Sequence, residues 1–303
     1  MKALVLGGNG FIGSHIVDYL LAAGHQVRVL DRSAEHFREA MAEVDYHLGD
    51  YGEAGTLKAA LEGIDIVYHL ASTTVPATSN QDPVADIQVN LVKTVQLLQS
   101  MVRQNVPRIL FMSSGGTVYG IPEQSPIPES HPLKPICSYG VVKVAIENYL
   151  FMYRQLDHIS PVVLRASNPY GERQGHTGVQ GVIGTFLNKL RSGEPIEIWG
   201  DGSIVRDFLH VSDLADFAVR AGTSEFQGVL NAGSGEGYSI CNILDAVANV
   251  TGQPVEPVFK QGRDYDVPEV VLDVTRAREE FGWDAKIDLS DGIERTWNWM
   301  QPC

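Results

Sequence analysis

The stretch KALVLGGNGFIG (residues 2–13) predicts the fold of this chain. Lys2–Leu6 is a short apolar run rich in strand-favouring residues, and Phe11–Ala23 has a helical periodicity that stops at Gly24. A strand, a glycine-rich turn and a helix, in that order, open a doubly wound α/β fold that binds a dinucleotide. The glycines alone would be weak support for this fold, because glycine is common in any turn.

Strands and helices continue to alternate up to about Ser167. Further strands are expected at Gln26–Leu30, Val44–Leu48, Ile64–Leu70, Arg108–Met112 and Pro161–Leu164, with helices at Asp86–Gln104 and Tyr139–Gln155. Such alternation is typical of parallel β-α-β units, so we expect a doubly wound parallel (Rossmann) sheet. The pattern after Ser167 is irregular. We therefore expect a nucleotide-binding domain of residues 1–167 and a smaller C-terminal substrate-binding lobe of residues 168–303, with some exchange of strands and helices between them.

The composition excludes several classes of function. The chain has 303 residues and a net charge of −14, so it would repel nucleic acid and anionic membranes, and an anionic substrate would need a local basic pocket. Its cysteines, Cys137, Cys241 and Cys303, are far apart and lack CxxC spacing, which argues against a disulfide framework and against a metal site. No signal peptide and no membrane-spanning run is recognisable, and a cytoplasmic protein is expected.

The glycines of the first turn predict a pyrophosphate site. Gly7 would allow the tight turn, Gly10 would let the backbone approach the phosphates, and Gly13 would let the helix pack closely on the strand. The N-terminus of that helix would face the negative phosphates. Asp31 ends the second strand, where a carboxylate accepts hydrogen bonds from the ribose 2′-hydroxyl and repels a 2′-phosphate. NAD is therefore favoured over NADP, although the positive charge of the adjacent Arg32 could weaken that preference.

Two later strands end in residues that could line the same cofactor site. Asp50 follows the third strand, where it could meet the adenine or simply be a solvated loop acid. The fourth strand ends in His69-Leu70-Ala71-Ser72, whose small residues leave room for a cofactor. His69 itself is expected to be a packed histidine rather than a catalytic one.

Tyr139 and Lys143 predict the chemistry of the site. They are four residues apart near the start of a helix, so their side chains share a face. A tyrosine becomes a useful base only if its pKa falls from about 10 toward 7, which corresponds to roughly 4 kcal/mol. The Lys143 ammonium and the positive nicotinamide ring of NAD could together supply that stabilisation.

An auxiliary hydroxyl is expected just upstream of this pair. The fifth strand ends in the segment SSGGTVYG (residues 113–120), and hydroxyls there could hydrogen-bond the substrate oxygen. Without the neighbouring Tyr139 and Lys143, the segment would be indistinguishable from an ordinary Ser/Gly turn.

The motifs together resemble the extended short-chain dehydrogenase/reductase superfamily, and within it the nucleotide-sugar 4-epimerases that act on UDP-galactose or UDP-GlcNAc. The resemblance covers nearly the whole chain and includes the glycine loop, HLA at residues 69–71, SSGGTVYG, and SYGVVK at 138–143. It continues through RASNPYG at 165–171, IWGDGSIVRDFLHVSD at 198–213, and RDYDVP at 263–268.

The resemblance implies a role for each matching position. The catalytic residues would be Tyr139 and Lys143, assisted by Ser114 or Thr117. The NAD-binding residues would be Gly7, Gly10, Phe11, Ile12, Gly13, Asp31, Arg32, Asp50, Tyr51, Leu70, Ala71, Ser72, Asn90 and Lys143. The nucleotide diphosphate would be held by Asn168, Val182, Arg206, Arg263 and Asp266, with the arginines on the phosphates. Val270 would lie near the 2-substituent of the sugar, where a small residue admits an N-acetyl group. A homodimer through the helices Asp86–Gln104 and Tyr139–Gln155, and a place in polysaccharide biosynthesis, are further implications.

Three departures within the family narrow the reaction. Gly115 stands where many members carry the bridging Ser or Thr, so Ser114, Thr117 or water must substitute. The 4,6-dehydratases carry Asp and Glu at the positions of Gly116 and Thr117, which argues against dehydration. Uronate 4-epimerases often carry arginine at Gly175, which argues against a glucuronate substrate. The remaining hypotheses are NAD-dependent 4-epimerisation of a UDP-hexose, NAD(P)-dependent reduction of a 4-keto sugar, and a non-catalytic NAD(P)-sensing regulator.

Overall fold

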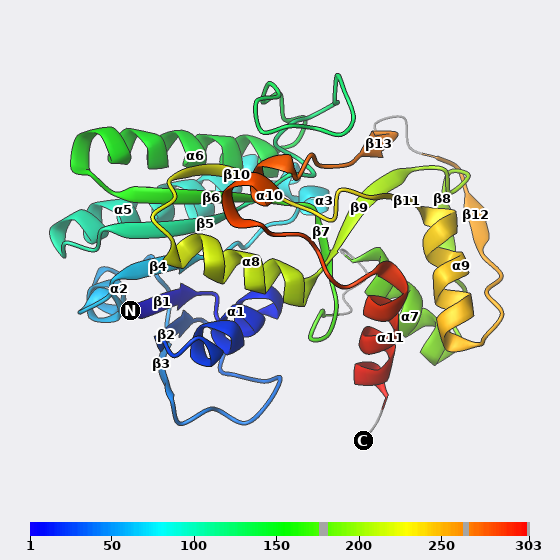
Figure 1. The fold of residues 1–303 in the computed structure, drawn as a ribbon, viewed down its shortest axis with the longest axis horizontal. Coiled ribbons are helices and arrows are strands. Elements are labelled where there is room, and N and C mark those ends of the chain that lie inside the picture. The colour runs from blue at the N-terminus through cyan, green and yellow to red at the C-terminus, as the bar shows by residue number, and fades with distance from the viewer. Residues whose placement is uncertain (176–180, 263–266, 302–303) are drawn as a thin grey trace. The chain divides into compact units, whose positions relative to one another are not determined.

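The structure is a computed structural model, and it describes residues 1–175, 181–262 and 267–301 (Figure 1). The contacts within the chain divide it into two compact units. Unit 1 consists of Met1–Gly120, Pro132–Arg165 and Ala215–Leu230, and unit 2 of Ile121–His131, Ala166–Leu214 and Asn231–Cys303. Both units are therefore built from segments that are far apart in the sequence.

A seven-stranded sheet confirms the doubly wound fold predicted from the sequence. Its strand order is β10-β6-β5-β4-β1-β2-β3, and β1 pairs in parallel with both β2 and β4. The strand order therefore reverses beside β1, which is where ligands bind in such sheets. The strands are β1 (Lys2–Leu6), β2 (Gln26–Asp31), β3 (Val44–Leu48), β4 (Ile66–His69), β5 (Arg108–Ser114), β6 (Ser160–Ala166) and β10 (Gly228–Ala232).

Helices cover both faces of this sheet. Helices α5 and α6 run along one face, and α1 and α8 along the other (Figure 1). Because both faces are covered, the central strand β1 is apolar throughout, and Ala3, Leu4, Val5 and Leu6 are fully buried. The helices here are α1 (Phe11–Ala22), α2 (Ala54–Leu61), α3 (Pro76–Ser79), α4 (Pro83–Asp86), α5 (Lys93–Arg103), α6 (Ser138–Asp157) and α8 (Val211–Thr223).

The expected helix Asp86–Gln104 is present, and it begins earlier, at Pro83. Its first part is not regular α-helix: α4 continues directly into a π-helical turn over Ile87–Val92 (η1), which continues into the α-helix α5. Helix α4 begins at Pro83 with Asp82 as its N-cap, whose carboxylate accepts the Ala85 N–H at 2.9 Å. The Thr94 hydroxyl of α5 donates to the carbonyl of Asn90 in the π-helical turn at 2.6 Å. Asn90, whose side-chain contacts are described below, lies within the π-helical turn.

Unit 2 is built around a small mixed sheet and a layer of helices. Its strand β9 pairs with β11, β13 and β7, while β8 and β12 form a separate parallel pair. Helices α7, α9 and α11 enclose an apolar core that includes Ile183, Leu187, Ile243 and Ile293. The strands are β7 (Asn168–Tyr170), β8 (Glu197–Trp199), β9 (Val205–His210), β11 (Gly237–Ser239), β12 (Val258–Lys260) and β13 (Glu269–Val270), and the helices are α7 (Val182–Ser192), α9 (Ile240–Thr251), α10 (Thr275–Phe281) and α11 (Leu289–Met300).

The described part of the chain contains no helix with the length and apolar character needed to cross a bilayer.

Close packing at Gly13 fixes the start of α1. A Cβ added to Gly13 would overlap the carbonyl oxygen of Gly7 and would lie 2.8 Å from the Cα of Gly8. Both neighbours are backbone atoms, which cannot move aside without displacing the loop. The requirement for glycine predicted from the sequence is therefore explained by the contact between α1 and the turn before it.

We expect Gly13→Ala to lower the free energy of unfolding by about 1–3 kcal/mol, as over-packed sites do. Gly55→Ala is the matched control, because Gly55 occupies an exposed position of helix α2 with nothing within 4 Å of an added Cβ. That variant should gain up to about 1 kcal/mol. Urea denaturation of the two variants measures both changes, and equal effects would contradict the packing argument.

Candidate active site

The glycine loop presents open backbone to a ligand. Gly7 has a φ of +82°, and a Cβ there would lie 3.2 Å from the backbone nitrogen of Ala71. Gly10 is the N-cap of α1, so no side chain accepts a hydrogen bond from the first-turn N–H groups at Phe11 and Ile12. These N–H groups and the positive end of the helix dipole suit a pyrophosphate. The loop thus fits a dinucleotide.

Asp31 is held at the carboxyl end of β2, beside this loop. Its carboxylate accepts the Asn9 N–H at 3.1 Å and the Ser33 N–H at 3.0 Å. Two backbone bonds fix the carboxylate where it could accept the hydroxyls of an adenosine ribose, while Arg32 is exposed. The geometry suits NAD rather than NADP.

Asp50 and Tyr51 connect the loop after β3 to the helices beyond it. Asp50 forms an ion pair with Lys93 at 2.7 Å and accepts the Gly52 N–H at 2.7 Å. Partial burial tends to raise the pKa of the Asp50 carboxyl, but these two bonds outweigh it and lower that pKa. Tyr51 is buried, and its hydroxyl donates to the Val89 carbonyl at 3.3 Å. A contact of Asp50 with adenine stays a prediction, since its carboxylate is already engaged.

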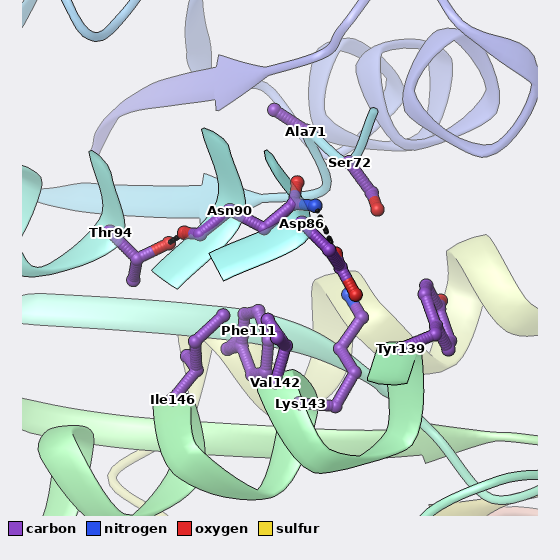
Figure 2. A pocket seen from close by; sticks show the side chains of 10 residues that line it. All are labelled: Ala71, Ser72, Asp86, Asn90, Thr94, Phe111, Tyr139, Val142, Lys143 and Ile146. Carbon is purple, nitrogen blue, oxygen red and sulfur yellow. Dashed lines mark hydrogen bonds between the residues drawn. The ribbon is translucent and has the colours of Figure 1, made fainter. Parts of the chain in front are cut away.

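A pocket in unit 1 brings together residues predicted to bind cofactor and residues predicted to be catalytic (Figure 2). Ala71 and Ser72 come from the segment after β4, and Tyr139 and Lys143 come from the first turns of α6. Leu70, just before them, donates its N–H to the Leu6 carbonyl at 3.1 Å. The pocket is lined by Ala71, Ser72, Asp86, Asn90, Thr94, Phe111, Tyr139, Val142, Lys143 and Ile146.

Lys143 is a buried ammonium with a fixed position. Its Nζ donates to the Met112 carbonyl at 2.8 Å and lies 5.3 Å from the ring centre of Tyr139 and 4.6 Å from that of Phe111. Burial lowers the pKa of Lys143 to about 8, against the opposing effect of the Glu147 and Asp86 carboxylates. The predicted placement of Tyr139 and Lys143 on one face of the helix agrees with this geometry.

Tyr139 alone does not have the lowered pKa that a base requires. Burial raises the pKa of Tyr139 above its ordinary value, and the charges of Cys137 and Asp86 raise it further. The Lys143 ammonium is therefore insufficient by itself to stabilise the phenolate. The second positive charge anticipated from the sequence, that of the nicotinamide ring, would favour the phenolate further.

His69 is packed in the core, as expected. Its Nε2 lies 2.8 Å from the Thr94 hydroxyl, and its ring contacts the rings of Tyr51 and Phe111. Burial, with a smaller contribution from Lys143, lowers the pKa of His69 to about 3. A histidine held neutral in this way fills space rather than transferring protons.

The structure distinguishes the hydroxyls of the 113–120 segment. Ser113 donates its hydroxyl proton to the Glu147 carboxylate at 2.5 Å, so this hydroxyl cannot also donate to a substrate. The Thr117 hydroxyl oxygen is buried and has no partner among the described residues. The Thr117 carbonyl packs against Gly140, since a Cβ there would lie 2.8 Å from its oxygen. The backbone of Thr117 therefore lies against the first turn of α6, and its hydroxyl is unused, which favours Thr117 over Ser114 as the auxiliary group.

Several residues that organise the pocket were not singled out from the sequence. Asp86 is fully buried and accepts hydrogen bonds from Asn90, Thr74 and Ser138. Asn90, predicted to contact NAD, also accepts the Thr73 N–H at 3.1 Å and so secures the segment after β4. Ser138, directly before Tyr139, was the only sequence signal for the role of Asp86. The two residues are 52 positions apart, and no local pattern indicates their hydrogen bond.

The residues predicted to bind the nucleotide diphosphate lie in unit 2. Asn168 donates to the Asp207 carbonyl at 2.8 Å, and Val182 is the first residue of α7. Arg206 lies in β9, paired with Tyr238 of β11 on one side and with the buried Val270 of β13 on the other. The predicted residues Arg263 and Asp266 lie outside the described residues.

Comparison with known proteins defines the class. Residues 3–233 match the family model described as the NAD dependent epimerase/dehydratase family. The chain is 38% identical to a UDP-glucose 4-epimerase of Mycolicibacterium smegmatis, over 98% of this chain and 97% of the relative. It is 31% identical to a dTDP-4-dehydro-6-deoxyglucose reductase of Escherichia coli, over 96% of this chain and 95% of the relative.

A solved structure agrees with these relatives. A UDP-glucose 4-epimerase of Thermus thermophilus, in complex with NAD, superimposes with a TM-score of 0.92 at 34% identity, over 99% of this chain and 98% of that chain. The protein therefore belongs to the NAD dependent epimerase/dehydratase family and is an NAD-dependent nucleotide-sugar epimerase.

We expect Thr117→Val to lower kcat by about 10- to 100-fold, because a hydrogen bond to a developing charge is worth about 1.5–3 kcal/mol. Thr117→Ser should restore most of the rate, while Ser114→Ala should change it less than Thr117→Val does. Steady-state kinetics of the three variants measure these effects. A larger loss in Ser114→Ala would assign the auxiliary hydroxyl to Ser114 instead.

Proposed function

We propose that the protein interconverts a UDP-hexose and its 4-epimer, with UDP-glucose and UDP-galactose as one substrate pair. The observation that carries this proposal is the pocket in which Tyr139 and Lys143 of α6 face Ala71 and Ser72, which follow β4. The UDP-glucose 4-epimerase relatives, matched over nearly the whole chain, support the same reaction.

The reaction is assigned to residues of this pocket. Tyr139 takes the proton of the sugar's 4-hydroxyl, and the Lys143 ammonium stabilises the resulting phenolate. NAD, when bound, would supply a reversible hydride acceptor for carbon 4, and the configuration inverts when the 4-keto sugar presents its opposite face before the hydride is restored. Tyr139 then gives its proton back to the new 4-hydroxyl. The Thr117 hydroxyl bonds the substrate oxygen through both steps.

Asp31 and Gly10 would hold the cofactor during this cycle. The carboxylate of Asp31 binds the adenosine ribose, and the N-terminal turn of α1 after Gly10 binds the pyrophosphate. In unit 2, Asn168, Arg206 and the α7 start at Val182 would hold the UDP moiety. Arg206 would then provide positive charge for the phosphates in a protein with a net charge of −14.

We expect the purified protein to contain bound NAD and to convert UDP-glucose to UDP-galactose with no added cofactor. Tyr139→Phe should lose at least ~10²-fold in turnover while still binding NAD, because general acid–base catalysis contributes about 10²–10⁴. Chromatography of the products and of the cofactor released by denaturation measures both. A near-normal rate in the Phe variant would remove Tyr139 from its role.

A second candidate function is the reduction of a 4-keto nucleotide sugar. The similarity to the Escherichia coli reductase favours it, and the Tyr139/Lys143 pair would serve that chemistry equally well. Under this alternative, turnover would depend on added reduced cofactor, with one reduced sugar formed per cofactor oxidised. The cofactor-free conversion described above separates the two functions.

We also propose that the enzyme accepts UDP-GlcNAc and UDP-GalNAc. Val270 is the residue assigned to the sugar's 2-substituent, and valine is much smaller than the tyrosine that would exclude an acetamido group. Its pairing with Arg206 in the sheet of unit 2 places it next to a residue assigned to the substrate. Val270 is also buried, and the substitution below separates a role in substrate specificity from a purely structural one.

Val270→Tyr is expected to abolish conversion of the N-acetylated pair by steric exclusion, while leaving the UDP-glucose/UDP-galactose rate within about threefold. The ratio of kcat/KM for the two pairs is the measurement, and thermal unfolding checks that the larger side chain is tolerated. Equal loss on both pairs, or no N-acetyl activity in the parent enzyme, would contradict the proposal.

The last element of the proposal is a homodimer through the α5/α6 layer. Helix α6 exposes Val141, Tyr149, Met152 and Leu156, whose spacing puts them on one side of the helix, and α5 packs alongside α6. Clustered exposed apolar residues of this kind mark interaction surfaces. A second copy, covering the same helices by twofold symmetry, is the proposed partner.

We expect light scattering coupled to size-exclusion chromatography to give twice the monomer mass. The double variant Met152→Lys with Leu156→Lys should elute as a monomer, because two charges would be buried at a symmetric contact. The exposed pair Val258→Lys with Phe259→Lys in unit 2 is the matched control and should stay dimeric. A monomeric parent would refute the dimer.

A further inference from the structure

The start of α6 is held by a segment distant in sequence. The Ser138 N–H donates to the Asn80 side chain at 2.8 Å, and the Tyr139 N–H donates to the Ser79 hydroxyl at 3.1 Å. The N-cap residue, Cys137, contributes no side-chain bond of its own. The α3–α4 segment therefore supplies the capping groups for the helix turn that carries Tyr139.

Asp86, the last residue of α4, adds a further hydrogen bond between the α3–α4 segment and the start of α6. Its Oδ2 accepts the Ser138 hydroxyl at 2.7 Å, and its Oδ1 accepts Thr74 at 2.7 Å and Asn90 at 2.8 Å. One carboxylate thus joins the segment after β4, the π-helical turn and the residue before Tyr139. Figure 2 shows Asp86 directed into the same pocket as Tyr139 and Lys143.

The charge of Asp86 is not neutralised by a direct ion pair among the described residues. Asp86 is fully buried, and its three side-chain hydrogen-bond donors are all neutral. The other buried carboxylate near Lys143, that of Glu147, differs because Arg165 pairs with it at 2.7 Å. A buried carboxylate without a paired cation is costly unless a nearby positive charge compensates it. In this pocket the nearby positive charge is Lys143.

We propose that Asp86 is a positioning residue for the acid–base pair: it fixes the first turn of α6 through Ser138 and supplies the negative charge that keeps Lys143 an ammonium. This inference rests on the proposed role of Tyr139 and Lys143 in catalysis. It assigns Asp86 no contact with the reacting atoms.

The charged and titratable groups around Lys143 give the direction of the effect. They are Glu147 and Tyr139 on α6, Asp86 at the end of α4, and the neutral His69 on β4, with Arg165 behind Glu147. Burial already lowers the pKa of Lys143 to about 8, and Glu147 and Asp86 oppose that lowering. Removal of the Asp86 charge should therefore lower the pKa of Lys143 further, so that the lysine loses its proton at a lower pH.

The test is Asp86→Asn, which keeps the shape of the side chain and removes the charge. In NAD-loaded enzyme labelled with ¹³C at the lysine ε-carbons, the Lys143 resonance, assigned by its absence in Lys143→Met, should titrate about one pH unit lower than in the parent. The alkaline limb of the kcat profile should move down with it. Asp86→Ala is the second variant, in case the amide opposite Ser138 and Asn90 prevents folding.

Two further variants separate charge from position. Asp82→Asn removes one negative charge from the exposed N-cap of the same helix and should leave both the titration and the rate unchanged, since asparagine caps equally well. Ser138→Ala removes the bond to Asp86 but keeps its charge, and should lower kcat severalfold without moving the Lys143 titration.

An unchanged Lys143 titration in both Asp86 variants would overturn the inference, as would an equal shift in Asp82→Asn or in Ser138→Ala. The titration of Lys143 needs no turnover. Failure of the proposed epimerisation is therefore distinguishable from failure of the role assigned to Asp86.

Discussion

The burial of the Lys143 ammonium is the constraint on which the pocket depends. A buried charge must be matched by fixed partners, and Lys143 has the Met112 carbonyl, the faces of two aromatic rings, and two buried carboxylates on different elements. These partners come from β5, α4 and α6, so the position of one ammonium depends on the correct relative placement of all three elements. The Glu147–Arg165 pair extends the same requirement to β6.

Sheet topology explains why these partners can meet. The order β5-β4-β1-β2 puts the carboxyl ends of β1, β2 and β4 side by side, with Leu6 level with both Leu30 and His69. The glycine loop, Asp31 and the Ala71–Ser72 segment follow directly from those ends. Helix α6 begins at this edge, with Tyr139 in its first turn near Ala71 and Ser72, and then runs back along the sheet (Figures 1 and 2). The residues proposed to bind NAD and those proposed to catalyse the reaction therefore lie at one edge of the sheet.

The sequence predicted those parts whose physical cause is local. The glycine loop, Asp31 and the Tyr139/Lys143 pair were identified because each depends on neighbours within one turn or one β-α unit. Three features were missed because their cause is not local. The first is strand β10, which pairs with β6 although residues 167–214, between the two strands in sequence, belong to unit 2. The π-helical turn at Asn90 and the role of Asp86 both depend on hydrogen bonds to distant segments, which periodicity does not report.

The ionisations of Tyr139 and Lys143, the pair proposed to be catalytic, show why that role would depend on the cofactor. Burial lowers the pKa of Lys143 but raises the pKa of Tyr139, so in the protein alone the lysine would lose its proton before the tyrosine does. Acid–base catalysis needs the reverse order, a phenolate beside an ammonium. Added positive charge in the pocket favours the phenolate directly, while the Asp86 and Glu147 carboxylates oppose the loss of the lysine proton. The Asp86 carboxylate, which disfavours the phenolate in the protein alone, thus helps to preserve the ammonium once the cofactor's charge is present.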